Sequence, residues 1–171
     1  MTSLATAQPF VLGPEEGEPY WFVGTLTIIK ATGETTDGSF SMVEQLAPPG
    51  ISPPLHVHHE DDELFYVLEG TVEFQVGDDR LTAGPGSTVY GPHGVPHTYL
   101  TTTEARMLVV THEPGFEGMF AEVGRPAESW TIPEEPPSEA EIERIHEVAD
   151  EYGFELLGPP LELEDRSATE S

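Results

Sequence analysis

Three histidines and one glutamate in the central part of the chain have the residue types and the spacing of a metal site. His56 and His58 are two residues apart, Glu63 follows after a short acidic stretch, and His97 stands further along the chain. Residues i and i+2 of a strand project from the same face, so the first two imidazoles would point the same way. Three neutral imidazoles and a carboxylate suit Fe(II), Mn(II), Ni(II), Co(II) or Zn(II) and leave coordination positions open. We therefore expect a divalent transition metal ion in each chain, without a preference among these metals.

The segments between these residues must turn if all four side chains are to meet. Glu63 is five residues after His58, an odd step that would aim it at the opposite face of one continuous strand. A turn over residues 59–62 removes this conflict, and Glu63 then begins a second strand over residues 63–69. His97 follows a Gly-Pro-His-Gly turn, so it falls near the start of a strand that is distant in sequence and adjacent in space.

This arrangement resembles the cupin superfamily, whose two characteristic motifs match the chain at nine positions. These positions are Gly50, His56, His58, Glu63, Gly70, Gly86, Pro92, Gly94 and His97. A tenth motif position, usually asparagine, is Thr101 here, which puts a turn contact in doubt and leaves the metal ligands unaffected. The flanking segments at residues 20–22, 115–118 and 152–160 look like those of small single-domain cupins described as quercetin 2,3-dioxygenase-like.

The resemblance implies both a fold and a reaction. The fold would be all-β, an antiparallel double-sheet jelly-roll barrel. The reaction would be the cleavage of a small flavonol-like hydroxylated aromatic with O2 by a metal-dependent dioxygenase. In such enzymes the carboxylate that corresponds to Glu63 is also proposed to accept the proton of the substrate hydroxyl. Glu63 would then be both a metal ligand and the general base. Cupins are often dimers, so the resemblance also implies a homodimer.

Other interpretations of the same ligand set stay open. Cupins with these ligands include isomerases and lyases, which would use the same Lewis acid without O2. A non-enzymatic, small-molecule-binding cupin is a third candidate. A closed tetrahedral zinc site would make the metal purely structural, and Glu63 would be a plain ligand if it transfers no proton. Surface histidines are the remaining interpretation, which the match of four ligand residues to both motif spacings disfavours.

Strand-like segments recur at short intervals between Gly and Pro turns, as in an antiparallel double-sheet fold. The expected strands and hairpin cover residues 21–30, 40–46, 63–69, 72–83, 87–90, 97–100 and 105–111. A chain of 171 residues without an internal repeat is most simply one domain. We divide it into an N-terminal arm (1–19), a cupin barrel (20–133), a C-terminal helical extension (134–160) and a disordered polar tail (161–171).

One helix is well defined by the sequence. Ser138 and Glu141 form a capping box after two prolines, and Gly153 can end the helix. The apolar positions fall on one helix face and are Ile142, Ile145, Val148, Ala149 and Tyr152. We expect this helix to lie outside the barrel and to cover an open edge. A catalytic role is disfavoured because its one histidine, His146, has no metal-binding partner nearby.

Side chains on the same strand faces as the metal ligands would line a substrate cavity. Alternation places Phe65 and Val67 on the face of the glutamate ligand and Tyr99 on that of the last histidine. Met42, on an earlier strand, would join them. An aromatic and aliphatic lining favours a flat phenolic molecule over a sugar or a phosphate, although core packing explains the same residues at least as well.

The composition limits the partners and the location of the protein. The formal net charge is -26, from 32 acidic and 6 basic residues, so neither nucleic acid nor an anionic membrane is an expected partner. The chain has no cysteine, so metal binding must use nitrogen and oxygen ligands. No apolar run approaches the roughly 20 residues that span a bilayer, and the N-terminus lacks a signal-peptide pattern. We expect a soluble cytoplasmic protein, whose acid excess is also compatible with adaptation to high salt.

Overall fold

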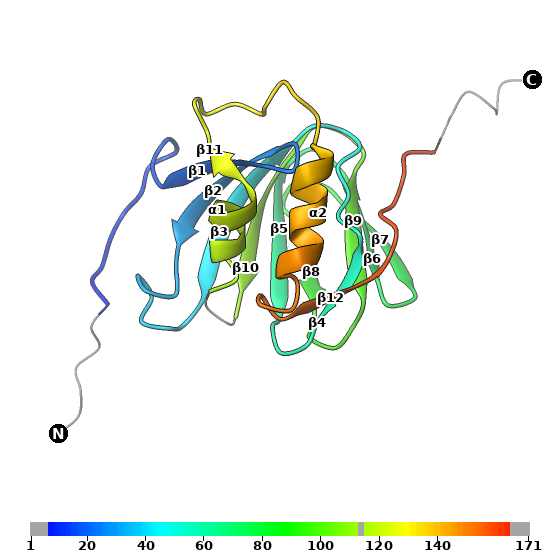
Figure 1. Cartoon of the computed structure of the whole chain (residues 1–171), viewed down its shortest axis with the longest axis horizontal. Helices are drawn as coiled ribbons and strands as arrows, with labels where there is room; N and C mark the ends of the chain where they lie inside the picture. The colour runs from blue at the N-terminus through cyan, green and yellow to red at the C-terminus, as the bar shows by residue number, and fades with distance from the viewer. Residues whose placement is uncertain (1–6, 113–114, 165–171) are drawn as a thin grey trace, which may run out of the picture.

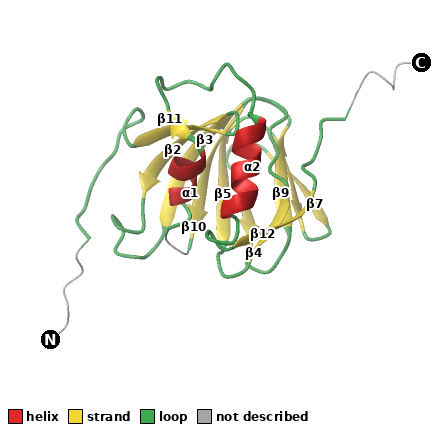
Figure 2. Ribbon diagram, viewed as in Figure 1, coloured by secondary structure: helices red, strands yellow, loops and turns green. Residues whose placement is uncertain are grey.

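The computed structural model describes residues 7–112 and 115–164 and consists mainly of two antiparallel β-sheets that face each other (Figure 1). The larger sheet has the strand order β11-β1-β2-β3-β10-β5-β8, and the smaller one has the order β12-β4-β9-β6-β7. Two helices lie next to each other across one side of the sheets (Figure 2). The expected all-β, antiparallel double-sheet fold of the jelly-roll type is confirmed.

The strands of the larger sheet are β1 (Glu18–Phe22), β2 (Thr25–Ala31), β3 (Ser41–Ala47), β5 (Glu63–Glu69), β8 (Thr88–Gly91), β10 (Ala105–Thr111) and β11 (Arg125–Pro126). Those of the smaller sheet are β4 (Leu55–His58), β6 (Val72–Val76), β7 (Asp79–Ala83), β9 (His97–Thr101) and β12 (Phe154–Gly158). The helices are α1 (Gly118–Val123) and α2 (Glu139–Val148). Within the part of the chain that the structure describes, neither helix is long and apolar enough to cross a membrane.

Two segments differ from the expected elements. The strand expected over residues 21–30 is interrupted at Val23 and Gly24, whose φ angles are 46° and 78°, and it forms the antiparallel pair β1–β2. Helix α1 has no counterpart among the expected elements, so the fold has a second helix. Its six residues are too few to show a helical period, and no side chain caps its N-terminus.

Helix α2 forms where its capping box predicts it. The Glu141 amide donates to the Ser138 hydroxyl (3.2 Å), and the Ser138 amide donates to the Glu141 carboxylate (2.9 Å). Strand β12 follows α2 and pairs with β4, so the segment expected as a helical extension also adds a strand to the smaller sheet. Residues 1–6 of the expected arm and residues 165–171 of the expected tail lie outside the described residues.

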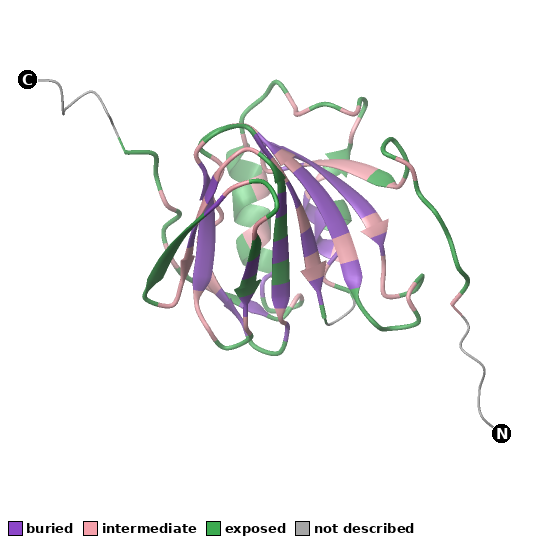
Figure 3. Ribbon diagram, turned by 180° about the vertical axis from the view of Figure 1, so that it is seen from behind, coloured by how far each residue is buried: buried purple, intermediate pink, exposed green. Residues whose placement is uncertain are grey.

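Strand alternation divides the larger sheet into an inner and an outer face. Every second residue of β10 is buried, and so are the first, third and fifth residues of β5. Phe65, Val67, Met107 and Val109 belong to the hydrophobic core between the sheets. Seen from behind, burial is concentrated in the strands, whereas the loops and much of the helix surface are exposed (Figure 3). The core therefore forms between the inner faces of the two sheets.

The face of β3 that points into the interior is not the expected one. Gln45 pairs with Met107, whose side chain is in the core, whereas Met42 pairs with Val110 on the outer face. Met42 therefore points away from the interior, contrary to the expectation that it lines a cavity. Each face of β3 carries apolar residues as well as buried polar side chains, which are Glu44 on the outer face and Ser41 and Gln45 on the inner one. Apolar character alone consequently does not identify the inner face.

Thr101, which replaces the usual asparagine of the motif, holds the turn at Gly50. Its hydroxyl accepts a hydrogen bond from the Ile51 amide (3.0 Å) and donates to the carbonyl of Pro48 (2.7 Å). The Gly50 amide donates to the Thr101 carbonyl (2.7 Å). The turn contact that the substitution puts in doubt is therefore present.

Gly70, at the end of β5, is expected to be the least replaceable glycine of the motif. Its φ angle is +80°, and an added Cβ would lie 2.1 Å from the Glu104 carbonyl oxygen and 2.8 Å from the Cα of Ala105. Gly86 has a similar φ angle of +86°, but an added Cβ would meet nothing within 4 Å. Gly86→Ala is therefore expected to lower the free energy of unfolding by about 1–2 kcal/mol through backbone strain alone. Gly70→Ala is expected to lose a further ~1–3 kcal/mol or more through the clash.

Urea denaturation of the wild type and of both variants measures this difference. The two substitutions add the same methyl group at the same sign of φ, so Gly86→Ala is a matched control for the backbone term. Equal losses in the two variants would show that the backbone at residues 104–105 moves away without cost.

Candidate metal centre

The four predicted ligands meet between the two sheets. His56 and His58 lie on β4 and His97 begins β9, so all three imidazoles come from the smaller sheet, where His56 and His97 are direct pairing partners. Glu63 is the first residue of β5 in the larger sheet. One ligand atom from each residue lies within 4.8 Å of those of the other three. His58, Glu63 and His97 are buried and His56 is partly buried, so the cluster joins the sheets in a shielded position.

The two expected turns, before Glu63 and before His97, position these ligands. The chain turns over residues 59–62, and Glu63 then pairs with Gly91 of β8. The Gly94 amide, in the turn before His97, donates to the carbonyl of His58 (2.8 Å). The two ligand-bearing segments are thereby held against each other by backbone contacts as well as by their side chains.

The orientation of the imidazoles fits a metal ion. The Nδ1 atom of His56 lies 2.7 Å from the carbonyl oxygen of Pro54, and that of His97 lies 3.1 Å from the carbonyl oxygen of Val95. A carbonyl at Nδ1 is the usual second contact of a metal-binding histidine, and it leaves Nε2 to face the cluster, where Nε2 of His97 meets Glu63. In His58 both ring nitrogens are buried, and neither has a hydrogen-bond partner in the described structure. Nε2 of His58 is 3.3 Å from Glu63 Oε2, without hydrogen-bond geometry.

A buried imidazole without a partner loses its hydrogen bonds to water and gains none in return. A cation among the four side chains would supply the missing partner of His58. The residues therefore fit a metal with nitrogen and oxygen ligands, and the donor set leaves the identity of the metal open.

The protonation states of the cluster agree with this fit. Burial lowers the pKa of His56 to about 4, so its ring is neutral at pH 7. Burial alone would raise the pKa of Glu63, but His58 and His97 beside it hold that pKa well below its usual range. Burial is the largest influence on the pKa of His97 and lowers it, but the hydrogen bond to Glu63 (2.5 Å between Nε2 and Oε2), the charge of Glu63 and the contact with the Val95 carbonyl together raise that pKa. The centre is thus an anion surrounded by imidazoles, to which a divalent cation is complementary.

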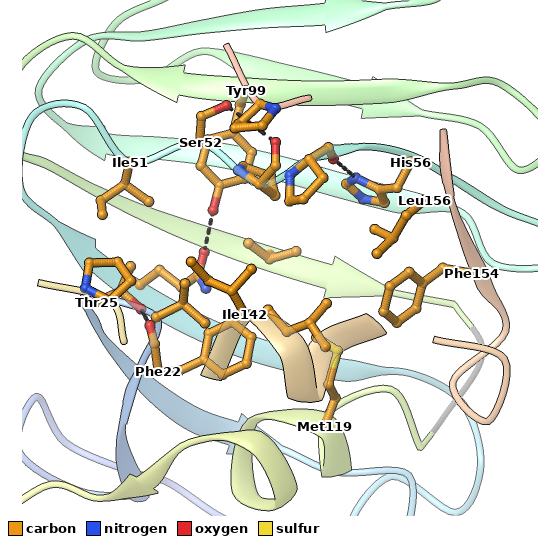
Figure 4. Close-up of a pocket in the computed structure, with 18 of the residues that line it drawn as sticks. Phe22, Thr25, Ile51, Ser52, His56, Tyr99, Met119, Ile142, Phe154 and Leu156 are labelled. Atoms are coloured by element: carbon orange, nitrogen blue, oxygen red, sulfur yellow. Dashed lines mark hydrogen bonds between the residues drawn. The ribbon is translucent and has the colours of Figure 1, made fainter. Parts of the chain in front are cut away.

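A cavity of about 560 Å³ adjoins the metal centre, and His56, His58 and Glu63 form part of its wall. The remaining wall is mainly apolar, as Figure 4 shows for Phe22, Ile51, Met119, Ile142, Phe154 and Leu156. The ring of Phe116 stands edge-on to that of His58, with 5.1 Å between the ring centroids. Among the described residues, no lysine or arginine lines the cavity. A mainly apolar, uncharged ligand matches these walls.

Two of the four residues predicted for substrate contact lie in this wall. Phe65 and Tyr99 line the cavity. Val67 is fully buried in the hydrophobic core and is not part of the wall. Met42 lies on the outer face of the larger sheet, as described above. The pattern of alternation places a residue on a face of its strand, but it does not tell how far along that face the cavity extends.

Several wall residues escape prediction from the sequence. Gln45 lines the cavity from β3 because the inner face of that strand is the one opposite to that expected. Ile142, Ile145 and His146 line it from α2, a helix that is expected only to cover an edge. The apolar face of α2 is the sequence signal for these residues. An apolar helix face predicts that the face is buried, but it does not tell whether the face packs on the core or lines a cavity.

Comparison with known protein sequences gives a family match and a more distant relative. The sequence profile of the cupin domain matches residues 42–111. Quercetin 2,3-dioxygenase of Bacillus subtilis (strain 168) is 28% identical over 142 residues, which cover 82% of this chain and 42% of that protein. The chain spans less than half the length of the curated relatives that it matches.

Comparison with solved structures gives the same fold. A predicted oxalate decarboxylase from Thermotoga maritima has a TM-score of 0.56 and 20% sequence identity, over 61% of this chain and 99% of that one. KdgF from Halomonas sp. has a TM-score of 0.54 and 18% identity, over 65% of this chain and 99% of that one. At these identities the likeness shows the fold.

Removal of one ligand tests the centre. His97→Ala is expected to lower the metal content of purified protein from about one ion per chain to a small fraction of that, because four ligands become three and Glu63 loses its neighbour. His59→Ala is the matched control, since this exposed histidine adjoins His58 in sequence and contacts Glu155 at 3.5 Å outside the cluster. Elemental analysis after dialysis, with circular dichroism to verify folding, measures the effect. Full occupancy in a folded His97→Ala protein would contradict the assignment.

Proposed function

We propose, on the premise that residues 42–111 of this chain form a cupin domain, that the protein is a metal-dependent dioxygenase that cleaves a flavonol-like hydroxylated aromatic with O2. The observation that carries the proposal is the position of the ligand cluster, which lies in the wall of a large apolar cavity. The similarity to a protein named quercetin 2,3-dioxygenase over 82% of this chain supports the same class of substrate.

The ligands would hold the metal from one side of the cavity. His56, His58 and His97 would bind it through Nε2, and Glu63 through its carboxylate. When bound, the metal supplies Lewis acidity, which lowers the pKa of a substrate hydroxyl and favours reaction of the resulting electron-rich ring with O2. Three of these ligands line the cavity, so a substrate inside it can reach the centre.

Glu63 would also accept the proton of the substrate hydroxyl. It is anionic, buried and part of the cavity wall, so a hydroxyl next to the centre lies within reach of a base that water does not solvate. Its hydrogen bond to His97 and its contact with His58 hold the carboxylate in place.

The cavity wall would orient the aromatic rings and exclude water. Phe65 of β5 and Phe116 before α1 both line the cavity, and both have ring contacts with the ligand histidines. An apolar surrounding strengthens the electrostatic interactions at the centre and protects an activated ring from protonation by water. The absence of lysine and arginine from the described wall disfavours substrates with two negative charges. The homodimer expected from the sequence stays a prediction.

Oxygen uptake tests the reaction. Protein reconstituted separately with Fe(II), Mn(II), Co(II), Ni(II) and Zn(II) is expected to consume O2 in the presence of quercetin with at least one of these metals, and metal-free protein is not. Loss of the flavonol absorbance, measured in parallel, ties the uptake to the substrate. No uptake by protein with a demonstrably occupied site would favour a metal-dependent isomerase or lyase reaction without O2, or a binding role.

Glu63→Gln tests the proton-transfer role. The amide keeps the shape and an oxygen ligand but cannot accept the proton, so kcat is expected to fall by about 10²-fold or more while part of the metal is retained. His59→Ala, which leaves the cluster intact, is the control for handling and metal loading. Unchanged turnover per bound metal in Glu63→Gln would restrict Glu63 to the role of a ligand.

A further inference from the structure

A chain of hydrogen bonds runs through the cavity wall apart from the metal ligands. The Tyr99 hydroxyl donates to Oε1 of Gln45 (3.1 Å), and Nε2 of Gln45 donates to the hydroxyl of Thr27 (3.2 Å). Tyr99 and Gln45 are 9% and 5% exposed, and both line the cavity. Figure 4 shows the hydrogen bond from Tyr99 extending across the cavity wall, with Thr25 and His56 on opposite sides of the view. This is a polar feature in an otherwise mainly apolar part of the wall.

The direction of this chain is fixed by a backbone carbonyl. The Thr25 hydroxyl donates to the carbonyl of Phe22 (2.7 Å), and it lies 3.0 Å from the hydroxyl of Thr27. A hydroxyl has a single proton, so Thr25 can only accept from Thr27. Thr27 has then used its own proton and can only accept from Gln45. The amide of Gln45 must therefore turn Nε2 toward Thr27 and Oε1 toward Tyr99.

Two hydrogen-bonding positions stay unused in this arrangement. The amide nitrogen of Gln45 has a second N–H, and the phenolic oxygen of Tyr99 has lone pairs. The phenol of Tyr99 is the donor in its hydrogen bond to Gln45, so its proton is engaged there and its lone pairs remain. Gln45 thus offers a donor to the cavity, and Tyr99 offers an acceptor.

Gln45 lies some distance along the larger sheet from the metal centre, and the Tyr99 hydroxyl reaches it from β9 of the smaller sheet. Glu63 pairs with Thr111 of β10, and Gln45 pairs with Met107 of the same strand. The two registers are four residues apart, which is about 13 Å along a strand. Phe65 and Val109 are paired between these positions, and both line the cavity. A ligand that reaches both ends must be elongated, with an apolar middle and a polar group at each end.

We propose that Gln45 and Tyr99 form a second binding subsite, which takes a neutral hydroxyl at the end of an aromatic substrate whose other end lies at the metal centre. This assignment rests on the proposed function. A hydroxyl can accept from the amide of Gln45 and donate to the oxygen of Tyr99, so it satisfies both unused positions. A carboxylate would meet one N–H and no cation, and an ammonium group would find no carboxylate there. Gln45 is thus a specificity-determining residue, and Thr27 is a positioning residue that acts through it.

Binding of two flavonols under anaerobic conditions tests the subsite. Quercetin carries hydroxyls on both of its outer ring systems, whereas 3-hydroxyflavone keeps only the hydroxyl–ketone pair that would face the metal. In metal-loaded protein, Gln45→Leu is expected to weaken quercetin binding about tenfold, the equivalent of one hydrogen bond, and to leave 3-hydroxyflavone binding within about twofold. Titration calorimetry measures both dissociation constants. Tyr99→Phe, which removes the phenolic oxygen, is expected to act in the same direction and serves if Gln45→Leu does not fold.

Thr27→Val tests whether Thr27 positions Gln45. Thr27 is fully buried and lies outside the cavity wall, so its replacement by a residue of equal shape touches no ligand. The substitution removes the acceptor that orients Gln45, and the ratio of the two dissociation constants is expected to move toward that of Gln45→Leu. A residue with a structural role alone would weaken both flavonols equally and leave that ratio unchanged.

Three outcomes separate the two proposals. Equal effects of Gln45→Leu on both flavonols, or no effect, would overturn the subsite, whether or not the wild type consumes O2. Flavonol binding with the expected selectivity but without O2 uptake would uphold the subsite and overturn the dioxygenase reaction. Failure of metal-loaded wild type to bind either flavonol would overturn both.

Discussion

The buried charge of Glu63 is the constraint on which the arrangement of the two sheets depends. The residue is 4% exposed, and an uncompensated carboxylate in such a position would cost on the order of several kcal/mol. The larger sheet supplies this anion, and the smaller sheet supplies all three imidazoles. Compensation is therefore possible only if β5 of one sheet meets β4 and β9 of the other. The cluster of the four side chains consequently joins the two sheets at the cavity wall.

Helix α2 closes part of the cavity that the two sheets leave open. Ile142 and Ile145 of α2 line the cavity, and the helix is tied down near both ends. Near its start, the Glu141 carboxylate accepts from the Val23 amide in the turn between β1 and β2 (3.3 Å). Beyond its end, the Tyr152 hydroxyl donates to Glu122 of α1 (2.6 Å). A helix that would otherwise serve as a cover is thus held in a fixed position over the cavity, and its apolar face sets the shape available to a ligand.

The part of the site that was predictable from the sequence is the part set by short-range spacing. His56 and His58 share a face because two residues separate them on one strand, and the turn before Glu63 follows from an odd step that a single strand cannot accommodate. The inner position of Gln45 could not be derived in this way. Both faces of β3 carry apolar residues and a buried polar one, so the choice depends on pairing with β10, which is more than fifty residues away in sequence. The short helix α1 shows neither a helical period nor a capping residue in the sequence, so it became evident only from the structure.

The net charge of the chain affects whether a substrate would lose its proton before or after it binds. A formal charge of -26 produces a field that disfavours the approach of anions, and no lysine or arginine in the described cavity wall offsets it. A phenolic substrate would therefore enter in its neutral form. Its proton must then leave inside the cavity, where Glu63 is the anionic group of the ligand cluster. Under the proposed function, the substrate therefore binds first and transfers its proton to Glu63 afterwards. This order requires a neutral ligand, and Gln45 and Tyr99 are arranged to recognise a neutral hydroxyl.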